Sequence, residues 1–266
     1  MATTAARPVV RRSDRLRQVA VTVAEVVCVV GTLVGVGVLG TRVEESSGGA
    51  LAADATLLAP AGPAFSIWSV VYLGLAGYTV WQWLPEQATD RRHRAIGWLV
   101  AASMVLNALW LLVTQQGWIW VSVVVIVVLV RTLGLLVRRL TEHPSYGTAE
   151  TVLVDGTFGL YLGWVAVATC ANVTAALVAS GVDPGRTASE VLAVVVIAVA
   201  AGVGVLLARR FGGRWAVAVA MAWGLGWIAW GRVAAEPRSV LVGLAALVAA
   251  LVVLSAASRV HRARAA

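Results

Sequence analysis

Eight long apolar runs dominate the sequence and constrain what the chain can fold into. Each is close to the length of about 20 residues that a helix needs to cross a bilayer. The runs are residues 19–40, 64–84, 95–114, 118–137, 152–180, 188–208, 214–231 and 239–257. This pattern predicts an all-α integral membrane protein with eight transmembrane helices.

The composition agrees with that prediction and decides how the positive charge is interpreted. Hydrophobic residues make up 60% of the chain, whereas soluble domains are about 45–50% apolar. A net charge of +8 would suggest a nucleic-acid partner in a soluble protein. Here the arginines lie at the ends of apolar runs, so we expect the lipid bilayer as the partner and no nucleic acid.

The placement of the 21 basic residues, all arginine, predicts an orientation. With a cytoplasmic N-terminus, the cytoplasmic segments hold sixteen of them: Arg7, Arg11, Arg12, Arg15, Arg17, Arg91, Arg92, Arg94, Arg138, Arg139, Arg209, Arg210, Arg214, Arg259, Arg262 and Arg264. The opposite segments hold Arg42, Arg186, Arg232 and Arg238. Since cytoplasmic loops of membrane proteins carry the excess of basic residues, both termini are expected in the cytoplasm. The first run exceeds the roughly 7–15 residues of a signal-peptide core, so an uncleaved helix is expected.

The sequence carries no pattern of enzymatic or metal-binding chemistry. Cys28 and Cys170 lie inside apolar runs, and the three histidines are isolated in polar segments. No cluster has metal-ligand spacing, and phosphate-binding loops and serine-nucleophile motifs are absent. We therefore expect no catalytic residues, no metal and no required cofactor.

Three apolar runs carry aromatic and amide side chains on one helical face. At about 100° per residue, residues spaced by three, four or seven positions share a face. The residues are Phe65, Trp68, Tyr72, Asn107, Trp110, Tyr161, Trp164 and Asn172. Such stripes serve either as contacts between helices or as walls of a pocket for a small molecule. Taken together they favour a pocket, with loop 41–63 either a plain surface loop or a lid over it.

Three motifs in the same runs resemble the TspO/MBR family, the tryptophan-rich sensory proteins. They are PAGPAFSIWSVVYLGLAGYTVWQ (60–82), LNALW (106–110) and LYLGWVAVATCANVTAAL (160–177), within residues 19–180. The resemblance implies a five-helix bundle whose aromatic cavity, covered by the loop after the first helix, binds tetrapyrroles or sterol-like molecules. It implies pocket roles for Trp68, Tyr72, Asn107, Trp110, Trp164 and Asn172.

The sequence departs from that family pattern in two places. Leu160 stands where family members often have proline before the tyrosine, and three further helices, 188–257, have no counterpart in the five-helix form. We expect a cytoplasmic arm (1–18), a TspO-like five-helix bundle (19–181), the three appended helices and a basic cytoplasmic tail (258–266). A longer bacterial branch of the family has this form, so a multi-pass protein of the bacterial cell membrane is expected.

Small residues and charges inside the runs suggest further contacts. Gly31 and Gly35, and likewise Gly159 and Gly163, have the four-residue spacing of close helix packing, either within the bundle or in a homodimer. Glu25, Arg131 and Asp155 form a possible intramembrane charge cluster. We expect Arg131 to pair with Asp155 or Glu25, the alternative being that each side chain reaches the interface.

These observations favour a membrane protein that binds a planar hydrophobic molecule, such as a tetrapyrrole, with a sensory or regulatory role. Stacking on tryptophan and tyrosine would supply affinity, and Asn107 and Asn172 would orient the ligand. The alternative is a secondary transporter with Glu25, Arg131 and Asp155 as a relay, although no proline interrupts a run. An enzyme acting on the bound ligand is a third hypothesis that no residue supports.

Overall fold

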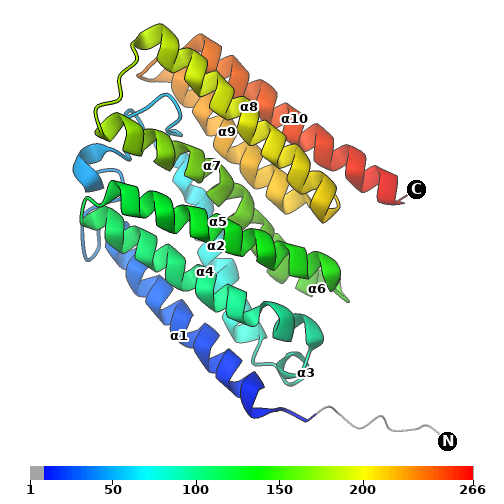
Figure 1. Ribbon diagram of the computed structural model, residues 1–266. Helices are drawn as coiled ribbons and strands as arrows, with labels where there is room; N and C mark the ends of the chain where they lie inside the picture. The colour runs from blue at the N-terminus through cyan, green and yellow to red at the C-terminus, as the bar shows by residue number, and fades with distance from the viewer. Residues whose placement is uncertain (1–8, 266) are drawn as a thin grey trace, which may run out of the picture.

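Eight long helices form the structure, a computed structural model that describes residues 9–265 (Figure 1). They are α1 (Arg12–Gly35), α2 (Ile67–Trp81), α4 (Arg91–Gln115), α5 (Ile119–Glu142), α7 (Thr157–Ala179), α8 (Arg186–Phe211), α9 (Trp215–Ala234) and α10 (Val240–Ala265). All eight are long and apolar enough to cross a membrane. For α2 and α7 the membrane span includes the turns that precede the helix. Residues 9–265 contain no strand. The prediction of an all-α, multi-pass membrane protein with eight spans is confirmed.

Several helices extend beyond the apolar runs that predicted them. Helix α1 begins at Arg12 and α10 continues to Ala265, so described parts of the predicted arm and tail are helical. The apolar pattern ends where charges begin, whereas backbone hydrogen bonding continues through arginine, a good helix former. The short elements are η1 (Ser46–Gly49), η2 (Gly62–Ser66), α3 (Pro85–Ala88), α6 (Thr148–Glu150) and the π-helical turn η3 (Thr151–Gly156).

Five of the long helices form a closed ring. Going round it, α1 contacts α2, α2 contacts α7, α7 contacts α5, α5 contacts α4, and α4 returns to α1. Helix α9 packs against the outside of α7, and α8 and α10 pack against each other and complete a three-helix unit beside the ring (Figure 1).

Both glycine pairs are used within the chain for close helix packing. A Cβ atom added at Gly31 would lie 2.9 Å from the Ala108 backbone, so Gly31 lets α1 approach α4. A Cβ atom at Gly159 would lie 2.7 Å from that of Ala216, and one at Gly163 would overlap the carbonyl oxygen of Val217. The second pair thus joins the ring to the three-helix unit. Neither pair is left free to form a dimer in this way.

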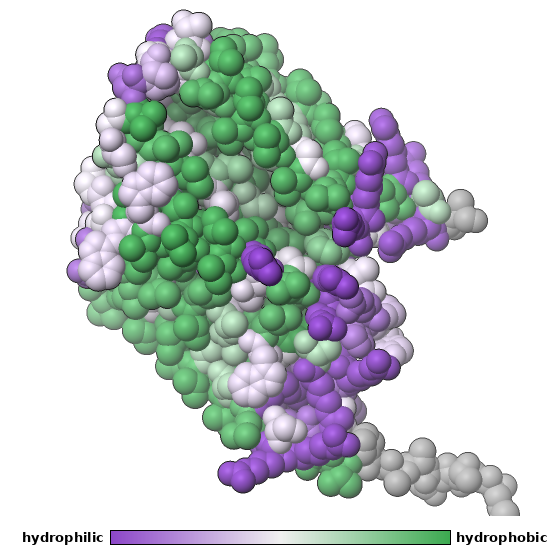
Figure 2. Space-filling view, viewed as in Figure 1, coloured by the Kyte–Doolittle hydropathy of each residue, from purple (hydrophilic) through white to green (hydrophobic). Residues whose placement is uncertain are grey.

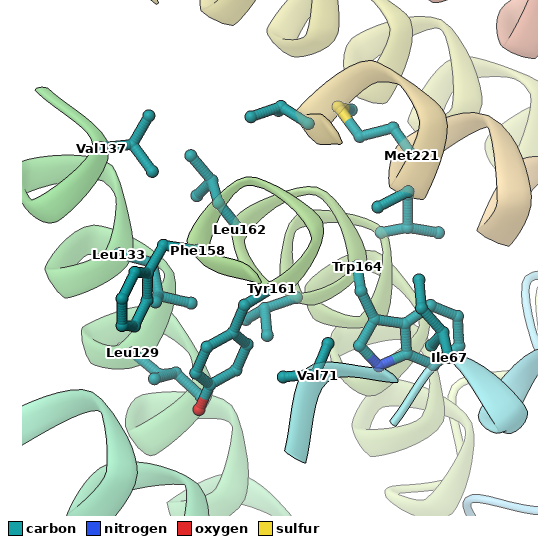
Figure 3. Packing of buried hydrophobic residues seen from close by; sticks show 14 of the residues in the cluster. Ile67, Val71, Leu129, Leu133, Val137, Phe158, Tyr161, Leu162, Trp164 and Met221 are labelled. Carbon is teal, nitrogen blue, oxygen red and sulfur yellow. The ribbon is translucent and has the colours of Figure 1, made fainter. Parts of the chain in front are cut away.

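Helix α7 supplies the large side chains at the centre of the core. Figure 3 shows Phe158 directed towards α5, Tyr161 between α5 and α2, and Trp164 beside Ile67 of α2. All three are buried, as is Met221, which faces them from α9. A core of this kind fixes α2, α5 and α9 around α7.

The two ends of the bundle differ in polarity. One end carries both described chain ends and gathers most of the hydrophilic side chains seen in Figure 2. We call it the arginine-rich end; it holds α3, α6, η3 and the turn at residues 212–214. The opposite end carries residues 36–61, 180–185 and 235–239, and we call it the loop end. Between the ends the surface is mainly valine and leucine, as a lipid-facing surface requires.

Candidate functional site

The aromatic side chains of α2 and α7 meet in one cluster. The rings of Trp68 and Tyr72 stack with centroids 5.1 Å apart and planes 16° apart. Tyr161 and Trp164 meet Trp68 edge to face, at 5.6 Å and 6.4 Å between centroids. Phe65 contacts Trp164 in the same way at 5.6 Å. The aromatic faces of α2 and α7 therefore meet each other and do not point into lipid on opposite sides of the bundle.

The two asparagines are paired with aromatic side chains. Asn107 Nδ2 donates to the Tyr72 hydroxyl at 3.0 Å. Trp110 Nε1 donates to Asn172 Oδ1 at 2.8 Å, and Asn172 Nδ2 donates to Ser122 Oγ at 3.0 Å. Both asparagines are buried. In this arrangement they hold the aromatic wall together, which is the helix-contact role, and sequence reasoning missed Ser122 as a partner.

A cavity of about 440 Å³ lies beside this cluster, in the corner between α1, α2 and α4. Phe65, Trp68, Tyr72 and Trp110 line it. Across from them lie residues at the end of α1, Thr32, Gly35 and Val36. The exposed residues of the lining are Val36, Arg42, Glu44 and Ser69, so the cavity opens between α1 and α2 close to the loop end.

The other predicted residues lie behind or below that wall. Trp164 and Asn172 border a smaller hollow of about 50 Å³ that shares Phe65 and Trp110 with the larger cavity. Tyr161 is fully buried and its hydroxyl donates to the Ser103 carbonyl at 3.2 Å. Four of the eight predicted residues therefore face the larger cavity directly.

The segment between α1 and α2 covers both hollows, as the lid interpretation predicted. Arg42, Val43 and Glu44 line the larger cavity, and Val43, Leu51, Thr56 and Pro60 line the smaller one. The Gln115 side chain holds this segment by exchanging two hydrogen bonds with the Thr41 backbone, at 2.7 and 3.0 Å. We call residues 41–63 the roof.

Helix α9 anchors the roof from the three-helix unit. Arg232 is buried and donates to the carbonyl oxygens of Thr56 and Ala53, both at 3.0 Å. Trp223 Nε1 donates to Ala64 O at 2.9 Å, and the Ala61 amide donates to Trp227 O at 3.3 Å. Sequence reasoning missed this role of α9 in holding the roof.

Arg232→Ala should loosen the roof. Each lost hydrogen bond has a charged donor and is worth about 1.5–3 kcal/mol. We expect the amides of residues 50–61 to exchange with deuterium faster in hydrogen-exchange mass spectrometry, while α5 is unaffected. Arg238→Ala, which removes an exposed arginine at the same end, is the control. Equal exchange in both variants would show that Arg232 does not hold the roof.

The predicted pairing of Arg131 is wrong. Asp155 instead forms an ion pair with Arg92, whose Nη2 lies 2.6 Å from Asp155 Oδ2, and a second ion pair with Arg214. Arg92 Nη1 lies 2.9 Å from Glu150 Oε1. We call Arg92, Glu150, Asp155 and Arg214 the buried ion network.

Geometry explains this correction. Asp155 lies in the π-helical turn η3 and is buried between α4 and α9, whereas Arg131 is on the exposed face of α5. No carboxylate in residues 9–265 lies within ion-pair distance of Arg131. Glu25 is buried in α1, and within the described chain its Oε2 atom has no hydrogen-bond partner. The three charges therefore form no cluster.

The fold and the site define a class: a polytopic helical membrane protein with a roofed aromatic cavity. No group of three potential metal ligands occurs in residues 9–265. The chain belongs to the family described as TSPO-like protein, whose match covers residues 19–258. This match includes α8, α9 and most of α10, beyond the five helices on which the motif resemblance rested. Neither the curated proteins nor the solved structures searched give a match.

Proposed function

We propose that the protein binds a planar hydrophobic small molecule, with a tetrapyrrole as the first candidate, in the roofed aromatic cavity. The observation that carries the proposal is the lining of Phe65, Trp68, Tyr72 and Trp110 around about 440 Å³. Ligand pockets typically have about 300–1,000 Å³ and predominantly apolar walls with a few polar groups. A sterol-like molecule is the second ligand class to test.

The polar groups at the cavity suggest how such a ligand would be oriented. Its ring system would lie against the stacked pair Trp68 and Tyr72, whose faces offer offset stacking. Arg42 lines the cavity from the roof and provides a cation for the carboxylates of a tetrapyrrole. Asn107 and Asn172 act on the ligand through the aromatic side chains that they hold, Tyr72 and Trp110.

We place the protein in a bacterial cell membrane with both termini in the cytoplasm. Support comes from the arginine-rich end, which carries both described chain ends and would face the cytoplasm by the positive-inside rule. The proposed role is sensory or regulatory. A bound ligand would change the conformation of the roof, and Arg232 would transmit that change to α9 through its hydrogen bonds to the roof. No catalytic step is part of this proposal.

The transporter alternative loses its main support. It required Glu25, Arg131 and Asp155 to act as a relay. The ion pairs of Asp155 are with Arg92 and Arg214, and Arg131 lies on an exposed helix face. We therefore do not carry the transport hypothesis further.

Trp68→Ala should weaken tetrapyrrole binding by about 1–3 kcal/mol, a loss of about 5- to 150-fold, because one large aromatic contact is removed. The measurement is a titration of the detergent-purified protein with protoporphyrin, haem and a sterol, the first two followed by their own absorbance. Trp118→Ala is the control, since Trp118 lies at the loop end with 58% of its surface exposed. Equal losses in both variants would count against the cavity as the binding site.

A further inference from the structure

A second hollow of about 740 Å³ lies outside the ring, towards the arginine-rich end. It is lined by α2, the turn η3, α7, the start of α9 and His261 of α10. None of its lining residues lines the aromatic cavity. The proposed ligand site therefore leaves this hollow unexplained.

The hollow is a groove between α2 and α9 with α7 as its floor. At the loop end the turn η2, which precedes α2, touches α9: Trp223 Nε1 donates a hydrogen bond to the Ala64 carbonyl. Towards the arginine-rich end the hollow separates the two helices. Its walls there are apolar and open: Leu73 is 75% exposed and Val152 is 68% exposed. Leu160 also lines the groove.

The end of the groove at residues 212–214 is polar and positively charged. Arg214 and His261 line it, and the Arg264 guanidinium lies directly against Gly212. Gly212 and Gly213 have φ angles of 76° and 70°, and a side chain at Gly212 would collide with that guanidinium. The turn thus allows Arg264 to approach the groove.

Positive charge exceeds negative charge at this corner. Asp155 is the carboxylate in the lining, and it is already paired with both Arg92 and Arg214. Trp215 is 43% exposed beside the groove, with its ring 6.3 Å from that of His261. Tryptophan and arginine in this arrangement are typical of the level of lipid headgroups.

We propose that this groove binds one anionic phospholipid of the bilayer. The phosphate group lies at the corner formed by Arg214, Arg264 and His261, and one acyl chain runs along Leu73 and Leu160. An apolar groove that ends in several cations matches an amphiphile with an anionic head, and basic pockets between transmembrane helices bind such headgroups.

The experiment is native mass spectrometry of the full chain, purified in detergent and titrated with phosphatidylglycerol or with phosphatidylcholine. We expect one phosphatidylglycerol to be retained at concentrations where phosphatidylcholine is not, and excess inorganic phosphate not to displace it. Equal retention of the two lipids would overturn the proposal. Displacement by inorganic phosphate would also overturn it, because the site would then recognise a free anion.

Paired variants test the two halves of the groove. Arg264→Gln should lower phosphatidylglycerol affinity about fivefold, since a basic residue near the membrane surface contributes about that factor. Its control is Arg12→Gln, an exposed arginine at the same end. Leu73→Trp should fill the groove and abolish retention of phosphatidylglycerol. Its control is Val195→Trp on α8, at a position that is 53% exposed, which should leave retention unchanged.

These variants can either support the lipid proposal or overturn it. Equal effects of each variant and its control would mean that lipid binds without using the groove, and the proposal would fail. A dimer that Leu73→Trp dissociates would assign the groove to a second copy of the chain instead. Since none of these residues lines the aromatic cavity, tetrapyrrole binding should be unchanged in all four variants.

Discussion

Asp155→Asn is expected to lower the free energy of unfolding by about 3–5 kcal/mol, the usual cost of removing one partner from a buried ion pair. The variant keeps the shape of the side chain but removes the charge that faces two guanidinium groups. The side chain of Arg92 is 2% exposed and that of Arg214 19% exposed, so water compensates little for the loss. Glu150 would remain to balance Arg92, but Arg214 would lose its carboxylate.

Unfolding in detergent, followed by circular dichroism as denaturant is added, measures this effect. Two controls separate the buried network from surface charge. Glu142→Gln breaks exposed pairs with Arg138 and Arg139 and should leave the midpoint almost unchanged. Arg131→Ala should do the same, because Arg131 lies on an exposed face.

The double variant Arg214→Met/Asp155→Asn provides the internal test. If the two groups interact as the structure shows, the double variant is less destabilised than the sum of the single variants. Strictly additive losses would contradict a direct pair. A large loss in Arg131→Ala would restore the pairing that the sequence suggested.

Gly163→Leu is expected to cost about 3 kcal/mol or more and to separate the three-helix unit from the ring. A side chain at this position meets the backbone carbonyl of Val217 and, at 2.8 Å, the Cβ atom of Ala220. Backbone atoms cannot move aside as a flexible side chain can, so α7 and α9 must separate. Overpacking typically costs about 1–3 kcal/mol and more where the surroundings cannot relax.

The same variant should also disturb the roof, although Gly163 does not touch it. When α9 moves away, Arg232 no longer reaches the carbonyl groups of Thr56 and Ala53. Faster hydrogen exchange at residues 50–61, together with a lower midpoint of unfolding, is the expected result. Gly202→Leu on α8 is the control, since an added Cβ atom there meets nothing within 4 Å. An unaltered roof in a destabilised Gly163→Leu protein would show that α9 is not what holds the roof in place.

The sequence predicted the helices and the aromatic faces because both depend on local periodicity. A run of about 20 apolar residues requires a helix in lipid, and the spacing of Phe65, Trp68 and Tyr72 places them on one face whatever surrounds them. The order of helices round the ring then brings α2 and α7 together. The existence of each aromatic face follows from residue spacing, whereas the meeting of the two faces depends on how the helices pack.

The ion partners of Asp155 could not be predicted in this way. Counting residues gives the depth of a side chain along a helix but not the direction in which the helix is turned. From the π-helical turn at Thr151–Gly156, Asp155 reaches Arg92 of α4 and Arg214 just before α9, whereas Arg131 lies on the exposed face of α5. Arg92 was counted only as evidence for orientation.

The anchoring of the roof was hidden by distance along the chain. Arg232 and Thr56 are 176 residues apart, and no periodicity connects such segments. When only its sequence neighbours are known, Arg232 also resembles an ordinary arginine at the end of a membrane-spanning helix. The partners of the asparagines were hidden for a related reason, since the sequence showed that they needed partners but not that Tyr72 and Trp110 would supply them.

The opening of the aromatic cavity at the seam between α1 and α2 has a consequence for how any ligand arrives. A hydrophobic molecule entering there comes from the hydrocarbon phase, so its partition coefficient into the bilayer sets the concentration that the protein experiences. At equilibrium that coefficient links the mole fraction of ligand in lipid to its much lower aqueous concentration, so occupancy is most directly described by the mole fraction. Diluting the protein with extra lipid at a fixed total amount of ligand would empty the cavity, and a dissociation constant for it is properly expressed per lipid.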